Sequence, residues 1–425
     1  MALETVFSTD ASSVIFGPGA TREVGPRIRA LGCKRVLLVT DPRIAQLPAV
    51  TTAKESLAKA GVEVDIFDRV RVEPTDASFQ EAIDVATAGK YDGFVSVGGG
   101  STIDTAKVAN LYSTHPADFM AYVYPPLGEG RQVPGPLKPH VAIPTTAGTG
   151  SETTGNAVFD LHSAHVKTAI AHRYLRPNLG IVDPDNTRTM PPLVAAASGL
   201  DVLSHALESF TAKPFDTREA PEDPLKRTIY QGANPLSDIW SARAIELCAR
   251  YLARAVANAE DDEARTNMML ASTAAGIGFG NAGVHLPHAM SYPISALARH
   301  YAPAGYPDDH AIVPHGISVI LTAPAIFRWT SVANPERHLE AARLLGVETR
   351  GASAEDGGEL LAGALIDLMH KVEMPNGLNG VGITHDDMPS LVKGTLPQSR
   401  ITQLSPRPAD EDAYRELFAA SMTNW

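Results

Sequence analysis

The stretch Gly93-Phe-Val-Ser-Val-Gly-Gly-Gly-Ser-Thr-Ile-Asp-Thr-Ala-Lys107 joins an apolar run to a helix-like segment through three consecutive glycines. Its first five residues are typical of a buried strand, and the pattern from Ser101 to Leu111 predicts a helix. Glycines at such a junction let the backbone approach a pyrophosphate, and the free N–H groups at the helix start attract its charge. The order of the glycines differs from G-x-G-x-x-G, so the standard dinucleotide fingerprint is not matched.

A second loop of the same kind strengthens this interpretation. Pro144-Thr-Thr-Ala-Gly-Thr-Gly-Ser-Glu152 follows the apolar run His140–Ile143 and offers several hydroxyl groups beside two glycines. A single glycine turn can be purely structural. Two such loops after parallel strands favour a site for a phosphate and a ribose.

The segments around these loops alternate between strand and helix patterns. Predicted strands cover residues 35–40, 62–67, 93–97 and 140–143, and predicted helices cover residues 53–60, 78–88 and 101–111. Such alternation predicts βαβ units and a parallel sheet. From residue 191 the pattern becomes helical and Ala-rich, over residues 194–210, 235–259, 263–275, 336–345, 355–372 and 410–422. We therefore predict an α/β dinucleotide-binding domain over residues 1–190 and an all-α domain over residues 191–425, which holds the metal-site candidates described below.

Composition excludes several classes of protein. The 425 residues include 48 acidic and 36 basic side chains, a formal net charge of −12, which disfavours nucleic acid or an anionic membrane as the partner. Cys33 and Cys248 are the two cysteines, too few for a disulfide framework or a Cys-based zinc site. The opening residues carry Glu4 and Asp10 before the first basic residue, Arg22, unlike a secretory or transit segment. We expect a cytoplasmic protein.

An acidic residue follows the first predicted strand of the sheet. Asp41 comes directly after Thr40, where a carboxylate can bind the ribose of an adenosine and repel a 2′-phosphate. This position favours NAD over NADP. The alternative is that Asp41 caps the start of a helix.

One carboxylate and three histidines are candidates for a metal site. Asp201 and His205 are four residues apart on a predicted helix, so both project from one face. His288 and His315 stand beside small residues further along the chain. A carboxylate with three imidazoles suits Zn²⁺ or Fe²⁺, whereas Mg²⁺ and Ca²⁺ prefer more oxygen ligands. Spacing leaves three further histidines open as ligands: His285, His300 and His310.

Together these motifs resemble the iron-containing (group III) alcohol dehydrogenase family, over most of the chain. The resemblance implies an α/β domain with a helical domain, hydride transfer, NAD, and a divalent metal (Fe²⁺ or Zn²⁺). It assigns the metal to Asp201, His205, His288 and His315. It assigns the dinucleotide to Asp41, Gly98, Gly99, Ser101, Asp104, Thr145, Thr146, Thr149 and Lys167.

Four further stretches resemble one branch of that family, the hydroxyacid-oxoacid transhydrogenases: residues 230–240, 276–285, 290–293 and 392–398. That branch oxidises 4-hydroxybutyrate to succinate semialdehyde while reducing 2-oxoglutarate to 2-hydroxyglutarate. Many relatives have a second histidine four residues after the ligand at His288, whereas this chain has Tyr292. We include Tyr292 among the catalytic candidates.

Substrates that carry carboxylates need a cation in the site. Lys393, Arg400 and Arg407 lie on the C-terminal segment, and Arg favours bidentate pairing with carboxylates. We assign Lys393 and Arg400 to substrate binding, the alternative being ordinary surface charge. We expect a homo-oligomer that acts on small hydroxy acids and oxo acids, with no nucleic-acid or membrane partner. Two other functions stay open: an NAD-dependent alcohol or 4-hydroxybutyrate dehydrogenase, and a non-redox lyase resembling 3-dehydroquinate synthase.

Overall fold

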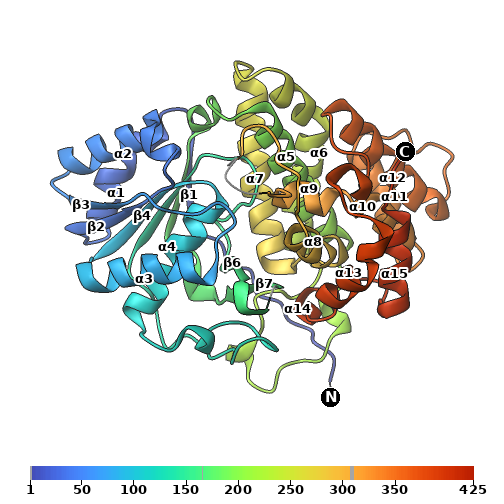
Figure 1. Cartoon of the computed structure of the whole chain (residues 1–425), viewed down its shortest axis with the longest axis horizontal. Helices are drawn as coiled ribbons and strands as arrows, with labels where there is room; N and C mark the ends of the chain where they lie inside the picture. Colours follow the sequence, from blue (N-terminus) through green and yellow to red (C-terminus); the bar gives the residue numbers. More distant parts are fainter. Residues whose placement is uncertain (1, 165, 307–310) are drawn as a thin grey trace. The chain divides into compact units, whose positions relative to one another are not determined.

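The computed structural model describes residues 2–164, 166–306 and 311–425, and the chain divides into two compact units (Figure 1). One unit is Ala11–Met190, and the other joins Met1–Asp10 to Pro191–Trp425. The sequence-based division assigned residues 1–10 to the α/β domain, whereas residues 2–10 pack with the helical unit. Leu3 forms an antiparallel bridge with Glu219, and the backbone N–H of Ser8 donates to Gln231 Oε1 over 2.9 Å.

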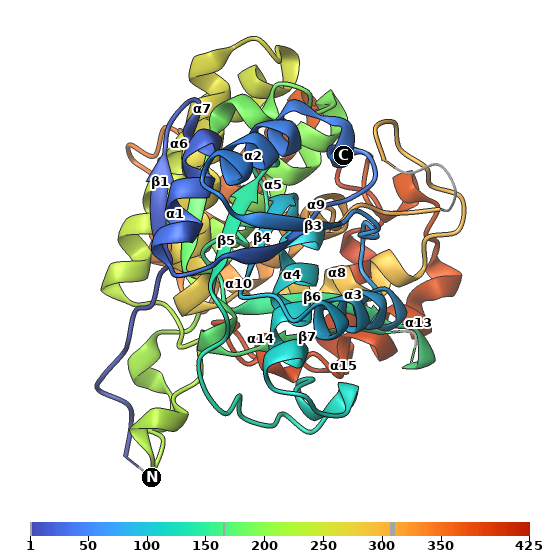
Figure 2. The ribbon, with the colours of Figure 1, turned by 90° about the vertical axis from the view of Figure 1, so that its left-hand side faces the viewer.

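The unit 11–190 is built on a parallel sheet, as predicted. Its described strands are β1 (Ser13–Phe16), β2 (Arg35–Val39), β3 (Glu63–Phe67), β4 (Gly93–Gly98), β5 (His140–Pro144) and β8 (Leu179–Val182). They pair in the order β1-β8-β5-β4-β2-β3 and every pairing is parallel (Figure 2). The short strands β1 and β8 were not predicted. Parallel order brings the carboxyl ends of β4 and β5, with their loops, to one edge of the sheet.

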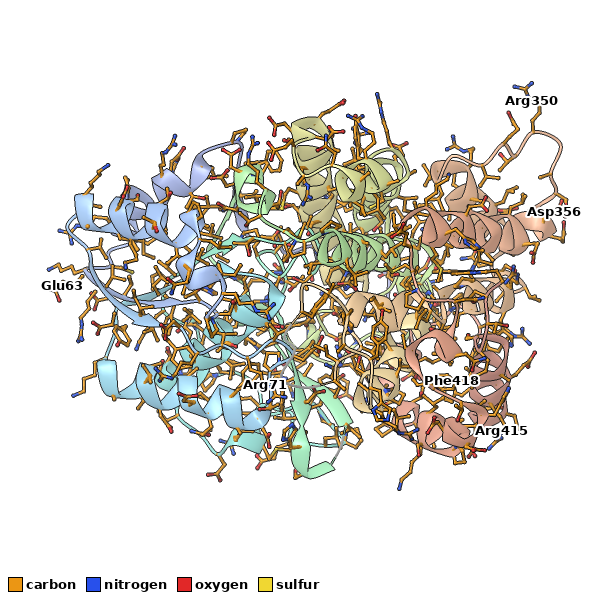
Figure 3. The ribbon with its side chains drawn as sticks, turned by 45° about the horizontal axis from the view of Figure 1, so that its top comes forward. Glu63, Arg71, Arg350, Asp356, Arg415 and Phe418 are labelled. Atoms are coloured by element: carbon orange, nitrogen blue, oxygen red, sulfur yellow. The ribbon has the colours of Figure 1, made fainter. Side chains whose placement is uncertain are left out.

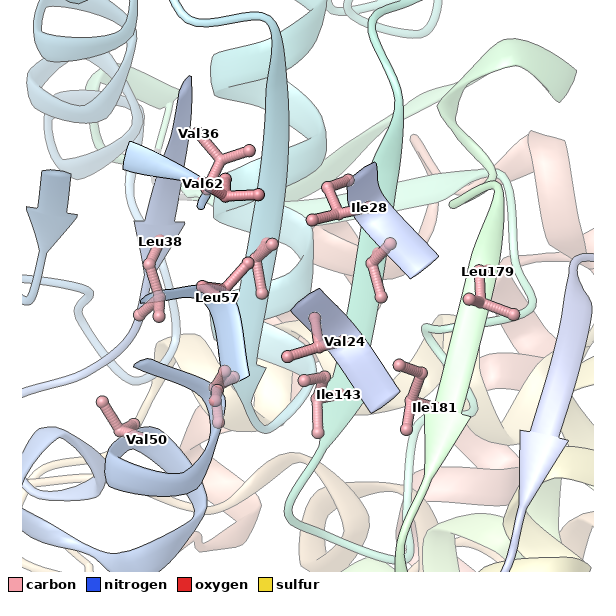
Figure 4. Close-up of a cluster of buried hydrophobic side chains, with 14 of the residues drawn as sticks. Val24, Ile28, Val36, Leu38, Val50, Leu57, Val62, Ile143, Leu179 and Ile181 are labelled. Carbon is pink, nitrogen blue, oxygen red and sulfur yellow. The ribbon is translucent and has the colours of Figure 1, made fainter. Parts of the chain in front are cut away.

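Helices cover both faces of this sheet. Against one face lie α1 (Val24–Ala30) and α2 (Pro48–Lys59), whose apolar residues meet Val36 and Leu38 of β2 (Figure 4). Against the other face lie α3 (Asp76–Gly89) and α4 (Gly100–Thr114), which meet the alternate residues Leu37 and Val39. Both sides of each inner strand are therefore buried, which explains its continuous apolar sequence. A separate antiparallel hairpin pairs β6 (Asn156–Leu161) with β7 (Val166–Ala171).

Helices make up the second unit. In the described residues they are α5 (Pro192–Thr211), α6 (Pro235–Ala257), α7 (Asp262–Ala282), α8 (Leu286–Ala296), α9 (His315–Ile320), α10 (Ala323–Ser331), α11 (Pro335–Leu344), α12 (Gly357–Lys371), α13 (Met388–Thr395), α14 (Ser399–Thr402) and α15 (Glu411–Ala420). Glycines allow their close packing. A Cβ at Gly199 of α5 would lie 2.2 Å from Leu252 of α6, and one at Gly278 of α7 would lie 2.4 Å from Ser241.

The peripheral helices are amphipathic. On α15, Phe418 is buried while Arg415 points outward and pairs with Glu411 (Figure 3). Arg350 and Asp356, before α12, are exposed on the surface (Figure 3). Within the described residues, every helix is too short or too polar to cross a membrane.

Candidate active site

Two of the predicted metal ligands lie on α5. Asp201 and His205 are buried, with His205 Nδ1 3.8 Å from Asp201 Oδ2. Their four-residue spacing puts both on the same face of the helix, as the sequence predicted. Because α5 is buried along most of its length, this face is held against other helices rather than exposed to solvent.

The other two predicted ligands come from α8 and α9. His288 Nε2 lies 3.5 Å from Asp201 Oδ1, and His315 Nε2 lies 3.8 Å from the same oxygen. His315 is the first residue of α9, and Gly316 follows it. A Cβ at Gly316 would lie 2.0 Å from the carbonyl oxygen of Ala197 on α5. Only glycine therefore allows α9 to approach α5 closely enough to bring His315 to Asp201.

This four-residue group suits a metal ion. One ligand atom from each of Asp201, His205, His288 and His315 lies within 4.8 Å of the others. Asp201 Oδ1, His205 Nδ1 and His288 Nε2 are buried and have no hydrogen-bond partner. Buried polar atoms without partners are costly, and a bound cation would satisfy all three at once. Three nitrogens and one oxygen form a donor set for Zn²⁺ or Fe²⁺.

The protonation states of these four side chains depend on one another. Burial would raise the pKa of Asp201, but the imidazoles of His205, His315 and His288 lower it overall, so this carboxyl stays ionised. Burial lowers the pKa of His205 to about 3, which keeps its imidazole neutral and able to bind a metal. Burial would also lower the pKa of His288, but Glu208 and Asp201 raise it to about 9 in the absence of a cation.

Two residues that the sequence analysis missed complete the surroundings of the ligands. Glu208 is fully buried on α5 and accepts a hydrogen bond from His288 Nδ1. Phe279 of α7 stacks on His205 with ring centroids 3.9 Å apart. A signal for Glu208 was present, because Asp201, His205 and Glu208 follow the i, i+4, i+7 spacing of one helix face. Nothing in the sequence distinguished Phe279 from an ordinary core residue.

The other candidate histidines differ in their surroundings. His285 is buried and its Nε2 lies 3.1 Å from Thr211 Oγ1, a contact within the packed interior. His300 is exposed. His310 lies outside the described residues.

In the α/β unit, the glycine turn stands between β4 and α4. The N-cap of α4 is Gly99, which has no side chain to bind the free N–H groups of the helix start. A Cβ at Gly98 would lie 2.4 Å from Thr102 Oγ1, and one at Gly100 would lie 2.4 Å from Thr149 Cγ2. The glycines therefore allow the loop after β5 to pack against this turn, and leave the helix start available for an anion.

The loop after β5 supplies hydroxyl groups to the same edge of the sheet. The backbone N–H of Thr145 donates to the carbonyl oxygen of Gly98 over 3.0 Å, which holds the two loops together. Thr145 Oγ1 is buried without a hydrogen-bond partner. Thr146 lies next to Gly99, with its side chain 3.4 Å from the position of a Cβ there. An uncapped helix start beside a buried, unpartnered hydroxyl fits a pyrophosphate group.

A buried ion pair on α4 holds that helix to the segment that follows β5. Lys107 of α4 is fully buried, and its Nζ donates to Asp104 Oδ1 over 3.1 Å, to Ser151 Oγ over 2.8 Å and to the carbonyl oxygen of Asn156 over 2.7 Å. Asp104 Oδ2 accepts from the backbone N–H of Val158 over 3.0 Å. Asp104, predicted to bind the dinucleotide, thus contacts neighbouring protein groups through both oxygens.

Three further predicted dinucleotide residues also have protein partners. Ser101 Oγ accepts from the backbone N–H of Glu73 over 3.3 Å. Lys167 is buried and pairs with Glu73 and Asp160; burial would lower the pKa of Lys167, but these two carboxylates raise it. Asp41 Oδ1 accepts from the backbone N–H groups of two residues that follow it in the chain, as a capping residue does. Burial raises the pKa of Asp41.

Two of the three predicted catalytic residues, Tyr292 and Arg400, lie against one aromatic cluster. Tyr292 of α8 is buried, its ring centroid 6.4 Å from that of His315, in a cluster with Tyr230 and Phe279. The Arg400 guanidinium lies 5.5 Å from the Tyr230 ring centroid, against the same cluster.

The other two cations of the C-terminal segment have different environments. Lys393 is exposed on α13. Arg407 packs 3.9 Å over the ring of Trp329 and donates to the carbonyl oxygen of that residue over 3.0 Å. Of the two predicted carboxylate anchors, Arg400 is therefore the one that packs against residues near the ligand group.

Sequence comparison with protein families gives two matches. Residues 11–184 match the model of the iron-containing alcohol dehydrogenases, and residues 228–422 match the C-terminal model of the same family. The two matches together cover most of both structural units.

Individual proteins are similar over nearly the whole chain. The mitochondrial hydroxyacid-oxoacid transhydrogenase of Bos taurus is 53% identical over 418 residues, which are 98% of this chain and 90% of that protein. A crystal structure of 1,3-propanediol oxidoreductase has a TM-score of 0.86 at 31% identity, covering 98% of this chain and 100% of that one. Sulfoacetaldehyde reductase from Bifidobacterium kashiwanohense, solved with NAD+, has a TM-score of 0.79 at 26% identity, covering 99% of each chain.

These similarities correct the expected location of the protein. The sequence analysis predicted a cytoplasmic protein from the acidic start of the chain. The Bos taurus relative is a mitochondrial protein, as is the human one at 51% identity, so the cytoplasmic prediction is wrong.

Proposed function

The chain belongs to the iron-containing alcohol dehydrogenase family and is an oxidoreductase, and from this premise we propose that it is a hydroxyacid-oxoacid transhydrogenase. The proposed reaction oxidises 4-hydroxybutyrate to succinate semialdehyde and reduces 2-oxoglutarate to 2-hydroxyglutarate. The observation that carries the proposal is the nearly full-length similarity to the Bos taurus transhydrogenase. The group Asp201, His205, His288 and His315 supports metal-dependent chemistry on an alcohol.

We propose NAD and a divalent cation, Fe²⁺ or Zn²⁺, as the cofactors. When bound, the cation supplies Lewis acidity toward the hydroxyl or carbonyl oxygen of the substrate, and NAD accepts and returns the hydride. Asp201, His205 and His288 are buried and His315 is partly exposed, and these four side chains would hold the cation. The turn Gly98–Gly100 and the hydroxyl groups of Thr145, Thr146 and Thr149 would bind the dinucleotide, with Asp41 selecting against a 2′-phosphate.

Arg400 and Tyr292 are the side chains proposed to act on the substrate. A guanidinium pairs with a carboxylate through two parallel hydrogen bonds, and both substrates carry a carboxylate remote from the reacting carbon. Support comes from the packing of Arg400 on Tyr230, in the cluster that includes Phe279 and Tyr292. A phenol both donates and accepts a hydrogen bond, so Tyr292 Oη can exchange the proton of the substrate hydroxyl.

One incubation tests the proposed reaction. The purified, metal-loaded protein is mixed with 4-hydroxybutyrate and 2-oxoglutarate without added NAD, and the products are separated and quantified. We expect succinate semialdehyde and 2-hydroxyglutarate in equal amounts, because NAD that stays bound to the protein would accept each hydride from one acid and pass it to the other. The variant Asp201→Asn serves as the matched control and should form neither product.

Other results of this experiment would identify a different function. Succinate semialdehyde that accumulates only in proportion to added NAD would indicate a dehydrogenase of 4-hydroxybutyrate. The absence of both products with and without NAD would contradict the proposed substrate pair. A homo-oligomer stays a prediction, which light scattering of the purified protein tests.

A further inference from the structure

Glu208 is a carboxylate with no contact to solvent. It lies on α5, three residues after His205, and its exposed fraction is 0%. An ionised carboxylate in such a place is strongly destabilising unless its oxygens accept hydrogen bonds. Three N–H groups meet this need, and all three belong to the segment that carries His288.

Two of these groups are backbone donors at the start of α8. Glu208 Oε1 accepts from the backbone N–H of His285 over 2.8 Å and from that of His288 over 3.2 Å. His285 is the N-cap of α8, and its own side chain makes no capping bond. The Glu208 carboxylate therefore caps α8 from another helix and places a negative charge at its positive end.

The third donor is the imidazole of His288. Glu208 Oε2 accepts from His288 Nδ1, and an ionised carboxylate only accepts, so this ring nitrogen carries a proton. The other ring nitrogen, Nε2, lies 3.5 Å from Asp201 Oδ1 and has no hydrogen-bond partner. Glu208 thus sets both the direction of the ring and the nitrogen that faces the other ligands.

We propose that Glu208 is a positioning residue for metal binding, which holds His288 with Nδ1 protonated and Nε2 directed at the cation. This inference rests on the metal centre of the proposed function and extends it to a residue outside the four ligands. Partners of this kind, which orient a ligating histidine from behind, typically change metal affinity by about 10–100-fold when they are replaced.

The substitution Glu208→Gln makes a sharp test because an amide has one acceptor and one donor end. If the amide oxygen faces the backbone N–H groups of His285 and His288, the NH₂ group faces His288 Nδ1. That nitrogen must then accept, which moves the imidazole proton to Nε2, where the cation should bind. If the amide is reversed, its NH₂ group opposes the two backbone donors. Either orientation opposes metal binding with almost no change in volume.

The experiment measures metal affinity in the absence of substrate and NAD. Metal-free full-length protein is titrated with Zn²⁺ against a competing chelator, and separately with Co²⁺, whose visible spectrum reports the geometry of its ligands. The variants are Glu208→Gln, Glu208→Asp and Thr211→Val. Thr211 is the matched control, because it joins α5 to α8 through His285 Nε2 and does not contact His288. Circular dichroism verifies that each variant is folded.

We expect Glu208→Gln to bind Zn²⁺ about 10–100-fold more weakly, with an altered Co²⁺ spectrum. Glu208→Asp keeps the charge and should fall between Glu208→Gln and the wild type, and Thr211→Val should match the wild type. An unchanged Zn²⁺ affinity and Co²⁺ spectrum in folded Glu208→Gln would overturn the inference. If Glu208→Gln does not fold, an unchanged affinity in Glu208→Asp would overturn it.

The design separates this inference from the proposed reaction. Wild-type protein that binds neither cation would overturn the metal centre and the role of Glu208 together. Because no substrate is present, an enzyme that fails to transfer hydride between the two acids can still give the expected metal affinities, and would then contradict the transhydrogenase proposal alone.

Discussion

The Phe279 ring lies flat on the imidazole of His205, with centroids 3.9 Å apart and ring planes only 8° from parallel. This contact leaves the imidazole few orientations, because rotation about the Cβ–Cγ bond of His205 would drive the imidazole into the Phe279 ring. On the other side, His205 stacks on His288, with ring centroids 4.4 Å apart. Aromatic packing therefore holds the proposed ligand His205 in place, while a hydrogen bond from Nδ1 holds the proposed ligand His288.

The first prediction concerns the ligands themselves. His205→Ala or His288→Ala should abolish metal binding and activity, because each removes one of four donors to a single cation. Elemental analysis of the purified variants measures the metal content. His338→Gln is the matched control, a buried histidine of the same unit that bonds to Thr330 instead. Full metal content in either alanine variant would remove that residue from the site.

The second prediction separates the two cations assigned to the substrate. Arg400→Ala should weaken 4-hydroxybutyrate and 2-oxoglutarate together by a factor of ~10–150, the effect of about 1.5–3 kcal/mol from a charge-assisted hydrogen bond. Lys393→Ala is the control, because Lys393 is exposed and should change little. Steady-state KM values for both acids provide the measurement. Equal KM values in Arg400→Ala and the wild type would place the carboxylate elsewhere.

The third prediction concerns the buried pair Lys107 and Asp104. Lys107→Met should lower the free energy of unfolding by about 3–5 kcal/mol, because it leaves the Asp104 carboxylate buried without its cation. The double variant Lys107→Met/Asp104→Asn should lose less than the sum of the two single variants. Urea titrations followed by circular dichroism measure these differences. Additive losses would show that the two charges do not interact.

The fourth prediction concerns cofactor choice. Asp41→Asn can still cap the turn that Asp41 now caps, but it lacks the charge that would oppose a 2′-phosphate. We expect its preference for NAD over NADP to fall by about tenfold or more, equivalent to 1.4 kcal/mol. Dissociation constants of both nucleotides give the ratio, with the exposed Asp68→Asn as the control. An unchanged ratio would mean that Asp41 serves only as a cap.

The fifth prediction concerns pH. Burial lowers the pKa of His140 to about 3, whereas an unfolded histidine titrates near pH 6.5. Between these values the unfolded chain binds a proton that the folded chain does not, so stability falls as the pH drops below about 6.5. His140→Gln should reduce this dependence by up to about 1.4 kcal/mol per pH unit. Urea midpoints at several pH values measure it, and the exposed His162→Gln should leave the slope unchanged.

Local sequence was sufficient for the parts of the fold whose signal is continuous. The runs that became β2 and β4 are buried on both faces, so apart from Arg35 and Ser96 their residues are apolar or glycine and easily recognised. By contrast, β1 has only four residues, three of them exposed, and β8 contains a glycine. Such strands form because neighbouring strands offer hydrogen bonds, and a single sequence does not reveal those neighbours.

The candidate site, too, was predictable only where the signal lies in one continuous segment of sequence. The proposed ligands Asp201 and His205 share a helix, so their spacing was informative. The distance between His315 and Asp201 depends instead on the approach of α9 to α5, which Gly316 permits. Glu208 and Phe279 act through contacts with ligands from other turns or helices, and their roles require the folded structure.

The four proposed ligands come from α5, α8 and α9, so Asp201 and His315 are brought together across more than a hundred intervening residues. A cation bound there would act as a reversible cross-link that the unfolded chain cannot keep. The melting temperature would then depend on the free metal concentration, because the free energy of unfolding would rise by about 4 kcal/mol at a metal concentration a thousand times the dissociation constant. In a cell, metal supply would set the lifetime of this enzyme as well as its rate.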